Sequence, residues 1–206
     1  MSNSSGSSSH PIFIILGLFA LLLMLATLKE NMRTRFPFLR TVFASINRPE
    51  DAPHTLKWLS TEAIATTTII LIFNIILAKY VLPHSMTSPA MLSTIMLIPI
   101  FASGLGDAFA EIVGKKWGKH PYQTTALFTD KKYTRTIEGS ATVFIITLIT
   151  GLCVAYMQSY HTPEFFWKAV YFLPLTLTIA EAKSPHTWDN PFLYLTGYLT
   201  IVVCLM

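Results

Sequence analysis

Two carboxylates one helical turn apart are the residues of this chain best placed to do chemistry. Asp107 and Glu111 stand where an apolar run ends, in "FASGLGDAFAEIVGKKWGKHP". Side chains four residues apart lie on one face of a helix, and Lys115 continues the series. Such a pair can share Mg²⁺, which takes oxygen ligands and usually keeps phosphate oxygens of a substrate as well. The same spacing also suits an ion-pair ladder to Lys115 on a solvated helix face.

Cations and glycines accompany this pair. Phosphate groups are bound by cationic side chains and by backbone N–H groups, which glycine leaves accessible. We therefore expect phosphate-binding residues at Gly106, Gly114, Lys115, Lys116, Lys119 and Arg135. The alternative is that these cations only supply the positive charge that cytoplasmic loops of membrane proteins carry.

The segment "TRTIEGS", residues 135–140, opens the next apolar run. Thr136 is a helix N-cap candidate, and Glu138 falls in the first turn, where a carboxylate complements the helix dipole. Gly139 would expose backbone N–H groups to an anion. Glu138 is thus a candidate catalytic carboxylate, with a capping-box role as its alternative.

The last polar connection is "AEAKSPHTWDNP", residues 180–191. Glu181 and Asp189 offer further carboxylate oxygens, and we expect Asp189 to act in catalysis or as a magnesium ligand. Asn190 offers an amide to the same phosphate-bearing substrate. The sequence Asp189-Asn190-Pro191 is also a good helix start, which makes N-capping the alternative.

The elements that position these residues are membrane helices. The 206 residues are 52% apolar and only 13% charged, with a mean hydropathy of +0.50, whereas a soluble domain has about 25% charged residues. Apolar runs of about 18 residues can cross a hydrocarbon core about 30 Å thick. The runs are Pro11 to Leu28, Ala63 to Leu82, Pro89 to Gly106, Ile137 to Tyr160, Phe165 to Ala180 and Pro191 to Met206. We predict an all-α integral membrane protein with about six transmembrane helices.

The positive charge predicts the orientation. Of the 15 Lys and Arg residues, all but Lys79 and Lys168 lie in polar stretches after the first, third and fifth runs. Under the positive-inside rule these charged loops are cytoplasmic and the N-terminus is outside. Residues 1–10 form a Ser-rich tail that we expect to be flexible, and residues 11–206 form one polytopic membrane domain. The net charge of +4 then belongs to a membrane-facing surface and not to a nucleic-acid interface.

Several site classes are disfavoured by missing motifs. The six histidines have no HxxxH or HExxH spacing, and Cys153 and Cys204 have no CxxC spacing, so no zinc or redox site is predicted. No Walker A, GxGxxG or GxSxG motif is present. Asn74 lies deep in a run, where we expect it to bond a neighbouring helix.

Taken together, these pieces resemble a known family. The ordered set is Gly106-Asp107 with Ala110, Gly114-Lys115-Lys116-Trp117-Gly118, Arg135 to Ser140, and Glu181 with Asp189-Asn190. It is similar to the CTP-dependent polyprenol and lipid-alcohol kinases, which include dolichol kinase, phytol kinase and the yeast-type diacylglycerol kinase. That group is related more distantly to phosphatidate cytidylyltransferase. The resemblance covers residues 89–206 and has Arg135 where family members commonly have Lys.

The resemblance implies transfer of the γ-phosphoryl group of CTP to the hydroxyl of a lipid alcohol at the cytoplasmic face. The acceptor would be phytol, farnesol, a dolichol-like polyprenol or diacylglycerol, and Mg²⁺ would be the cofactor. Asp107 and Asp189 would meet Mg²⁺ or the incoming hydroxyl, Lys115, Lys116 and Arg135 the phosphates, and Glu138 would be a second candidate base or metal ligand.

Two other functions fit the same residues. A cytidylyltransferase would use the same carboxylates and cations but would release pyrophosphate and form a CDP-lipid. A transporter or scaffold would need no chemistry, although ion-coupled carriers place ionisable residues near the bilayer midplane, and here the carboxylates lie in loops or at run ends. The choice of lipid, the general base and the oligomeric state stay open.

Overall fold

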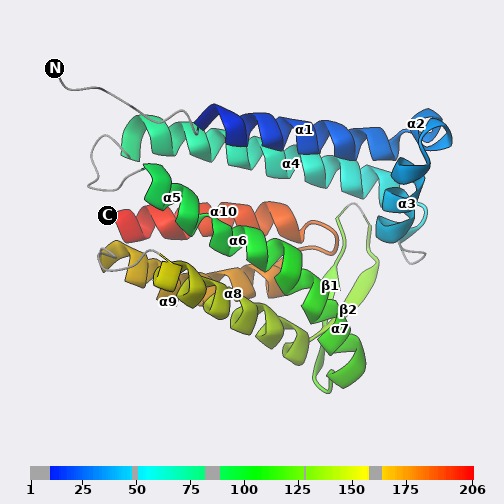
Figure 1. Cartoon of the computed structure of the whole chain (residues 1–206). Coiled ribbons are helices and arrows are strands. Elements are labelled where there is room, and N and C mark those ends of the chain that lie inside the picture. The colour runs from blue at the N-terminus through cyan, green and yellow to red at the C-terminus, as the bar shows by residue number, and fades with distance from the viewer. Residues whose placement is uncertain (1–9, 48–50, 82–88, 128, 158–163) are drawn as a thin grey trace. The chain divides into compact units, whose positions relative to one another are not determined.

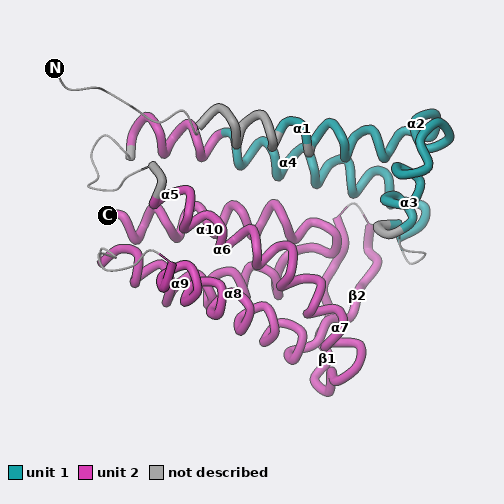
Figure 2. The backbone as a smooth tube through the Cα atoms, viewed as in Figure 1, with its two compact units in different colours: residues 1–71 teal, residues 72–206 magenta. Residues whose placement is uncertain are grey.

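The computed structural model of the chain describes residues 10–47, 51–81, 89–127, 129–157 and 164–206 (Figure 1). The predicted Ser-rich tail falls outside them, except for His10. The described chain is mostly helical and divides into two compact units, residues 1–71 and 72–206 (Figure 2).

The first unit contains three helices and most of a fourth. They are α1 (His10–Leu28), α2 (Glu30–Arg35), α3 (Pro37–Ile46) and α4 (Thr55–Ile76), whose last residues belong to the second unit. Pro37 occupies the first turn of α3, where its missing N–H costs nothing. The C-terminus of α1 is capped by Arg33, which donates to the carbonyls of Thr27 and Leu28 at 3.1 Å each.

The second unit holds the remaining elements. In chain order these are η2 (Leu77–Val81), α5 (Pro89–Ile95), α6 (Leu97–Phe101), the π-helical turn η4 (Ala102–Gly106), α7 (Asp107–Trp117), β1 (Pro121–Thr125), β2 (Lys132–Thr136), α8 (Ile137–Met157), α9 (Glu164–Lys183) and α10 (Asp189–Leu205). In its core, α9 packs between α8 and α10, and α7 packs on α8. Small residues mark the close approaches, since a Cβ on Gly151 would lie 3.3 Å from Val170.

Three of the described helices are long and apolar enough to cross a membrane: Thr55–Tyr80, Met91–Trp117 and Ile137–Met157. They correspond to the predicted second, third and fourth runs, and α10 is a shorter apolar helix. Large apolar side chains lie on the outside of the helices, as with Ile145 and Val203, which suits a lipid environment. These helices suggest a multi-pass membrane protein.

One internal contact matches its prediction directly. Asn74, in the part of α4 that belongs to the second unit, donates to the hydroxyl of Tyr198 on α10 at 2.9 Å. The Tyr198 ring also stacks on Phe73, with centroids 5.0 Å apart. The expectation that Asn74 bonds a neighbouring helix is confirmed.

The all-α expectation is wrong between α7 and α8. There, β1 and β2 pair antiparallel, with register from Pro121↔Thr136 to Thr125↔Lys132. Tyr122 is half-buried and Thr124 is buried, while Pro121, Gln123 and Thr125 are exposed. This alternation of β-branched and aromatic residues with polar ones is typical of a half-buried strand, and the sequence prediction treated it as a loop.

Candidate functional site

Arg135 lies between two carboxylates at one end of the second unit. Strand β2 carries the guanidinium inward, where Nη1 donates to Glu181 Oε1 at 2.8 Å and also to the Glu181 carbonyl. Nη2 donates to Asp189 Oδ2 at 3.4 Å. The side chains of Arg135 and Asp189 are each 13% exposed and that of Glu181 is 5% exposed. Two carboxylates share the Arg135 guanidinium, so each of them has a cationic partner in this buried cluster.

Glu181 is also the acceptor of a hydroxyl chain. Ser140, in the first turn of α8, donates to Glu181 Oε2 at 2.9 Å, and its Oγ lies 2.7 Å from the Tyr122 hydroxyl on β1. Glu181 lies one residue beyond the predicted run Phe165 to Ala180. Burial raises the pKa of its carboxyl, and the Arg135 charge opposes that rise. Burial likewise raises the pKa of Tyr122 above its usual value near 10.

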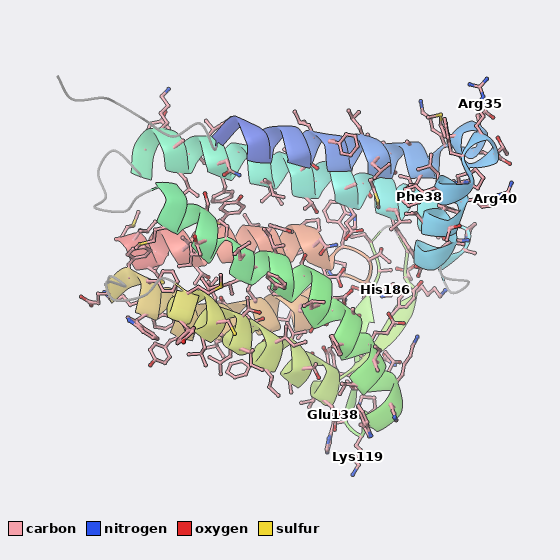
Figure 3. The ribbon with its side chains drawn as sticks, viewed as in Figure 1. Arg35, Phe38, Arg40, Lys119, Glu138 and His186 are labelled. Carbon is pink, nitrogen blue, oxygen red and sulfur yellow. The ribbon has the colours of Figure 1, made fainter. Side chains whose placement is uncertain are left out.

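The loop between α9 and α10 holds the hairpin in place. The His186 N–H donates to the Thr125 carbonyl at 2.9 Å, and the His186 ring stacks on Tyr133 with centroids 3.7 Å apart (Figure 3 labels His186). Thr187 follows with a φ of 64°, the left-handed region that turns the chain toward α10. Hairpin and loop therefore fix Arg135 and Asp189 against one another.

Asp107 begins α7 directly after the π-helical turn η4. Its N–H donates to the Ala102 carbonyl five residues earlier, as a π-helix requires. Such turns are frequent at functional sites. The turn also determines which way Asp107 faces.

The packing of α6 and η4 on α10 shows which residues of these segments lie opposite one another. A Cβ on Gly197 would lie 3.0 Å from Pro99 Cβ, and the side chains of Ser103 and Tyr194 are hydrogen-bonded. The two helices run antiparallel, so one further turn from Ser103 and Tyr194 leads to Asp107 and Asn190. Two predicted site residues from separate segments thus occupy the same level of adjacent helices.

The predicted phosphate-binding glycines lie in a helix contact. Gly106, Ala110 and Gly114 recur every four residues and face α8 and the Thr136 before it, while Gly118, beyond the end of α7, lies against Thr136. A Cβ on Gly106 would meet Val143 at 3.5 Å, and one on Gly114 would meet Thr136 Oγ1 at 2.8 Å.

The space beside Gly139, the facing glycine on α8, is also filled. A Cβ on Gly139 would lie 2.9 Å from the Ala110 carbonyl. The Gly139 N–H donates to Thr136 Oγ1 at 3.2 Å, which bears out Thr136 as the N-cap. These glycines let two backbones approach each other, and their nucleotide role stays a prediction.

The predicted cations of α7 are exposed at its C-terminal end. Lys115 pairs with Glu111 at 2.5 Å, which is the ion pair that the sequence offered as the alternative to a metal site. The Lys116 ammonium lies 4.7 Å from the Trp117 ring centroid. Lys119 and Glu138 lie at this same end of the unit (Figure 3). The Glu138 carboxylate contacts His120 Nδ1 at 2.7 Å.

The predicted metal ligands are not gathered into one cluster. Within the part of the chain that the structure describes, no three His, Cys, Asp or Glu side chains are grouped so as to hold a metal ion. Asp107, Glu111 and Asp189 lie on two helices, with Glu111 paired to Lys115 and Asp189 to Arg135. The Mg²⁺ site stays a prediction.

An apolar groove between α9 and α10 reaches the buried cluster. Its volume is about 310 Å³, and it is lined by Thr176, Ile179, Ala180, Lys183, Ser184, Phe192 and Thr196. Ser184 belongs to both features, because its hydroxyl donates to the Glu181 carbonyl at 2.8 Å and lies 3.4 Å from Arg135 Nη1. The groove therefore ends at the polar cluster.

Sequence reasoning missed several members of this site. Tyr122, Ser140 and Ser184 were not predicted, although Ser140 and Ser184 stand beside predicted carboxylates in the sequence. Inward alternation of Tyr122 and Thr124 was the available signal for the hairpin.

Comparison with protein-family models, with curated proteins and with solved structures found no match for this chain.

Proposed function

We propose that this chain is a membrane-embedded kinase that transfers the γ-phosphoryl group of CTP to the hydroxyl of a lipid alcohol. The observation that carries the proposal is the position of Ser184, which lines the apolar groove and also hydrogen-bonds within the buried cluster. A substrate with a long apolar chain and one polar end needs such a groove.

The groove suits the acceptor. Ile179, Ala180 and Phe192 would contact the hydrocarbon chain, and Lys183 and Ser184 stand where the hydroxyl would lie. Burying each CH₂ group gains about 0.8 kcal/mol relative to water, although in a bilayer the gain comes from packing. The groove opens between α9 and α10, so the hydrocarbon chain of the acceptor can enter it from the lipid.

Phosphoryl transfer needs positioning and charge neutralisation more than covalent chemistry from the protein. Lys115, Lys116 and Lys119 are exposed cations that would bind the CTP phosphates. In the reaction the lipid hydroxyl oxygen bonds to the γ-phosphorus as the bond from that phosphorus to the β,γ-bridging oxygen breaks. CDP leaves, and the hydroxyl proton passes to Asp107.

The geometry changes three assigned roles. Arg135 is paired with both Glu181 and Asp189, so we assign Arg135 and Asp189 to positioning the ends of α9 and α10 and not to the phosphates. Glu138, paired with His120, would orient the start of α8 beside the lysines.

Magnesium fits this site as part of the substrate. Because the described residues offer no three-carboxylate cluster, the ion would arrive bound to the CTP phosphates, and Asp107 would act on the incoming hydroxyl and not as a magnesium ligand.

The topology is proposed with the function. Three further spans, α1, α9 and α10, would join the three long apolar helices to give six. The N-terminus would lie outside, with the charged connections and the active face in the cytoplasm.

The test is a matrix of four nucleotides against a panel of lipid alcohols, with product mass measured for the purified full chain. CDP with a lipid phosphate supports the kinase, and pyrophosphate with a CDP-lipid supports a cytidylyltransferase instead. No product with any pair would favour a transporter or scaffold. Asp107→Asn should lower turnover by about 100-fold or more, whereas Glu164→Gln, which breaks an exposed pair with Lys168, should leave it unchanged.

A further inference from the structure

The connection between α1 and α4 exposes two aromatic side chains beside arginines. Phe36 is 51% exposed and Phe38 is 64% exposed. They flank Pro37, and Arg35 and Arg40 stand on either side of them. Exposed aromatic groups of this size next to cations are typical of a surface that another phase or partner covers.

This segment has a fixed conformation. Arg33 caps α1 and lies 3.9 Å from the centroid of the Phe43 ring, while Leu39 is only 5% exposed. Helix α3 consequently runs across the end of α1 (Figure 1). If α1 spans the bilayer, α3 lies along the bilayer surface.

The aromatic side chain and the arginine side chain of α3 point in different directions. Phe38 and Arg40 are two residues apart, about 200° around a helix, and Figure 3 places them on opposite sides of α3, with Arg35 also directed outward. A bilayer surface presents acyl chains and phosphate headgroups in that same order. Aromatic side chains enter the acyl boundary, and arginines reach the headgroups.

Charge indicates which lipids are bound. Residues 29–40 contain Lys29, Arg33, Arg35 and Arg40 but a single carboxylate, Glu30. Across the described residues, the Arg35 and Arg40 side chains take part in no ion pair or hydrogen bond. We propose that α2 and α3 form an anchor that binds anionic lipid headgroups through Arg35 and Arg40, with Phe36 and Phe38 in the acyl boundary. This anchor does not depend on the proposed kinase activity.

The experiment measures the depth of α3 in vesicles. The full chain, with Cys153→Ala and Cys204→Ala, receives a spin label at Thr41→Cys, an exposed position of α3 three residues after Phe38. It is reconstituted into phosphatidylcholine alone or with added phosphatidylglycerol, and label collisions with oxygen and with a water-soluble nickel chelate are compared. Phosphatidylglycerol should raise the oxygen-to-nickel collision ratio, and molar salt, which screens charges beyond about 3 Å, should reverse the rise.

Variants assign the effect to the named residues. Arg35→Gln/Arg40→Gln should abolish the phosphatidylglycerol response. Lys131→Gln/Lys132→Gln, which removes the same charge from the hairpin, should keep it, and Phe36→Ser/Phe38→Ser should lower the oxygen collisions. An equal response in both arginine and lysine variants, or a wild-type ratio that is indifferent to lipid and salt, would overturn the proposal. A label shielded from both reagents would assign the surface to a protein partner instead.

Discussion

Arg135 donates from one guanidinium nitrogen to both the side chain and the backbone carbonyl of Glu181. These residues are 46 positions apart, and they tie β2 to the C-terminal end of α9. With Asp189 on α10 as the second partner, one arginine connects three elements.

The first prediction concerns this pair. Arg135→Met leaves Glu181 buried without its cation, and loss of one partner of a buried pair costs about 3–5 kcal/mol. Chemical unfolding in detergent should show that loss, and Arg135→Met/Glu181→Met should recover only part of it, because Asp189 still lacks its cation. Glu111→Gln, at the exposed pair with Lys115, should cost less than about 1 kcal/mol. Equal costs for Arg135→Met and Glu111→Gln would contradict the buried cluster.

The second prediction separates packing from ligand binding at the glycines. Gly139→Ala places a Cβ 2.9 Å from the Ala110 carbonyl, so it should destabilise the α7–α8 contact by about 1–3 kcal/mol. Gly104→Ala is the matched control, because nothing lies within 4 Å of its Cβ, and alanine there should stabilise by about 0.5–1 kcal/mol. A Gly139→Ala protein with unchanged stability but weaker nucleotide binding would favour the phosphate-binding role.

The third prediction tests the groove. Ala180→Phe fills it from α9, and losing about 1.4 kcal/mol of packing with the hydrocarbon chain should lower kcat/KM for a long-chain alcohol about tenfold. A short-chain alcohol should be little affected. Leu175→Phe adds bulk at an exposed position of the same helix that is outside the groove, and should change neither value. If Ala180→Phe changes kcat/KM equally for both alcohols, the hydrocarbon chain of the acceptor does not lie in the groove.

The fourth prediction concerns alkaline pH. Burial raises the pKa of Tyr122 above 10, so the folded state holds this proton more tightly than the unfolded state does. The resulting stability is present below the unfolded pKa near 10 and is lost as the pH rises through the folded pKa. Tyr122→Phe should make the decline in unfolding free energy above pH 10 shallower. An unchanged slope would show that the hydroxyl ionises with equal ease in both states.

The apolar spans could be predicted because membrane crossing is a local property of composition and length. Ala63 to Leu82 and Pro89 to Gly106 needed no knowledge of their neighbours. The third span runs on to Trp117, as the helical spacing of Asp107, Glu111 and Lys115 indicated, and α7 packs there on α8.

The charged members of the site were predictable from the sequence, whereas their pairing and the hydroxyl groups around them were not. Arg135, Glu181 and Asp189 stood out as charges near run ends, but their pairing depends on how a hairpin and a loop meet. Glycine at positions 106, 114 and 139 indicated that something lies close to the backbone there. The sequence did not indicate whether a second helix or a ligand does so. The register of α6 and η4 on α10 supplied the neighbourhood of Asp107 and Asn190, which spacing within one segment cannot give.

The π-helical turn Ala102–Gly106 carries one residue more than regular winding needs. Deleting one residue here would restore an ordinary α-helix, yet it would rotate α7 by about 100° relative to α6. Asp107 would then leave the level of Asn190, and the glycines would leave α8. At Gly104, where a Cβ has open space, substitution is harmless while deletion is not, so the number of residues in this turn matters more than their identity.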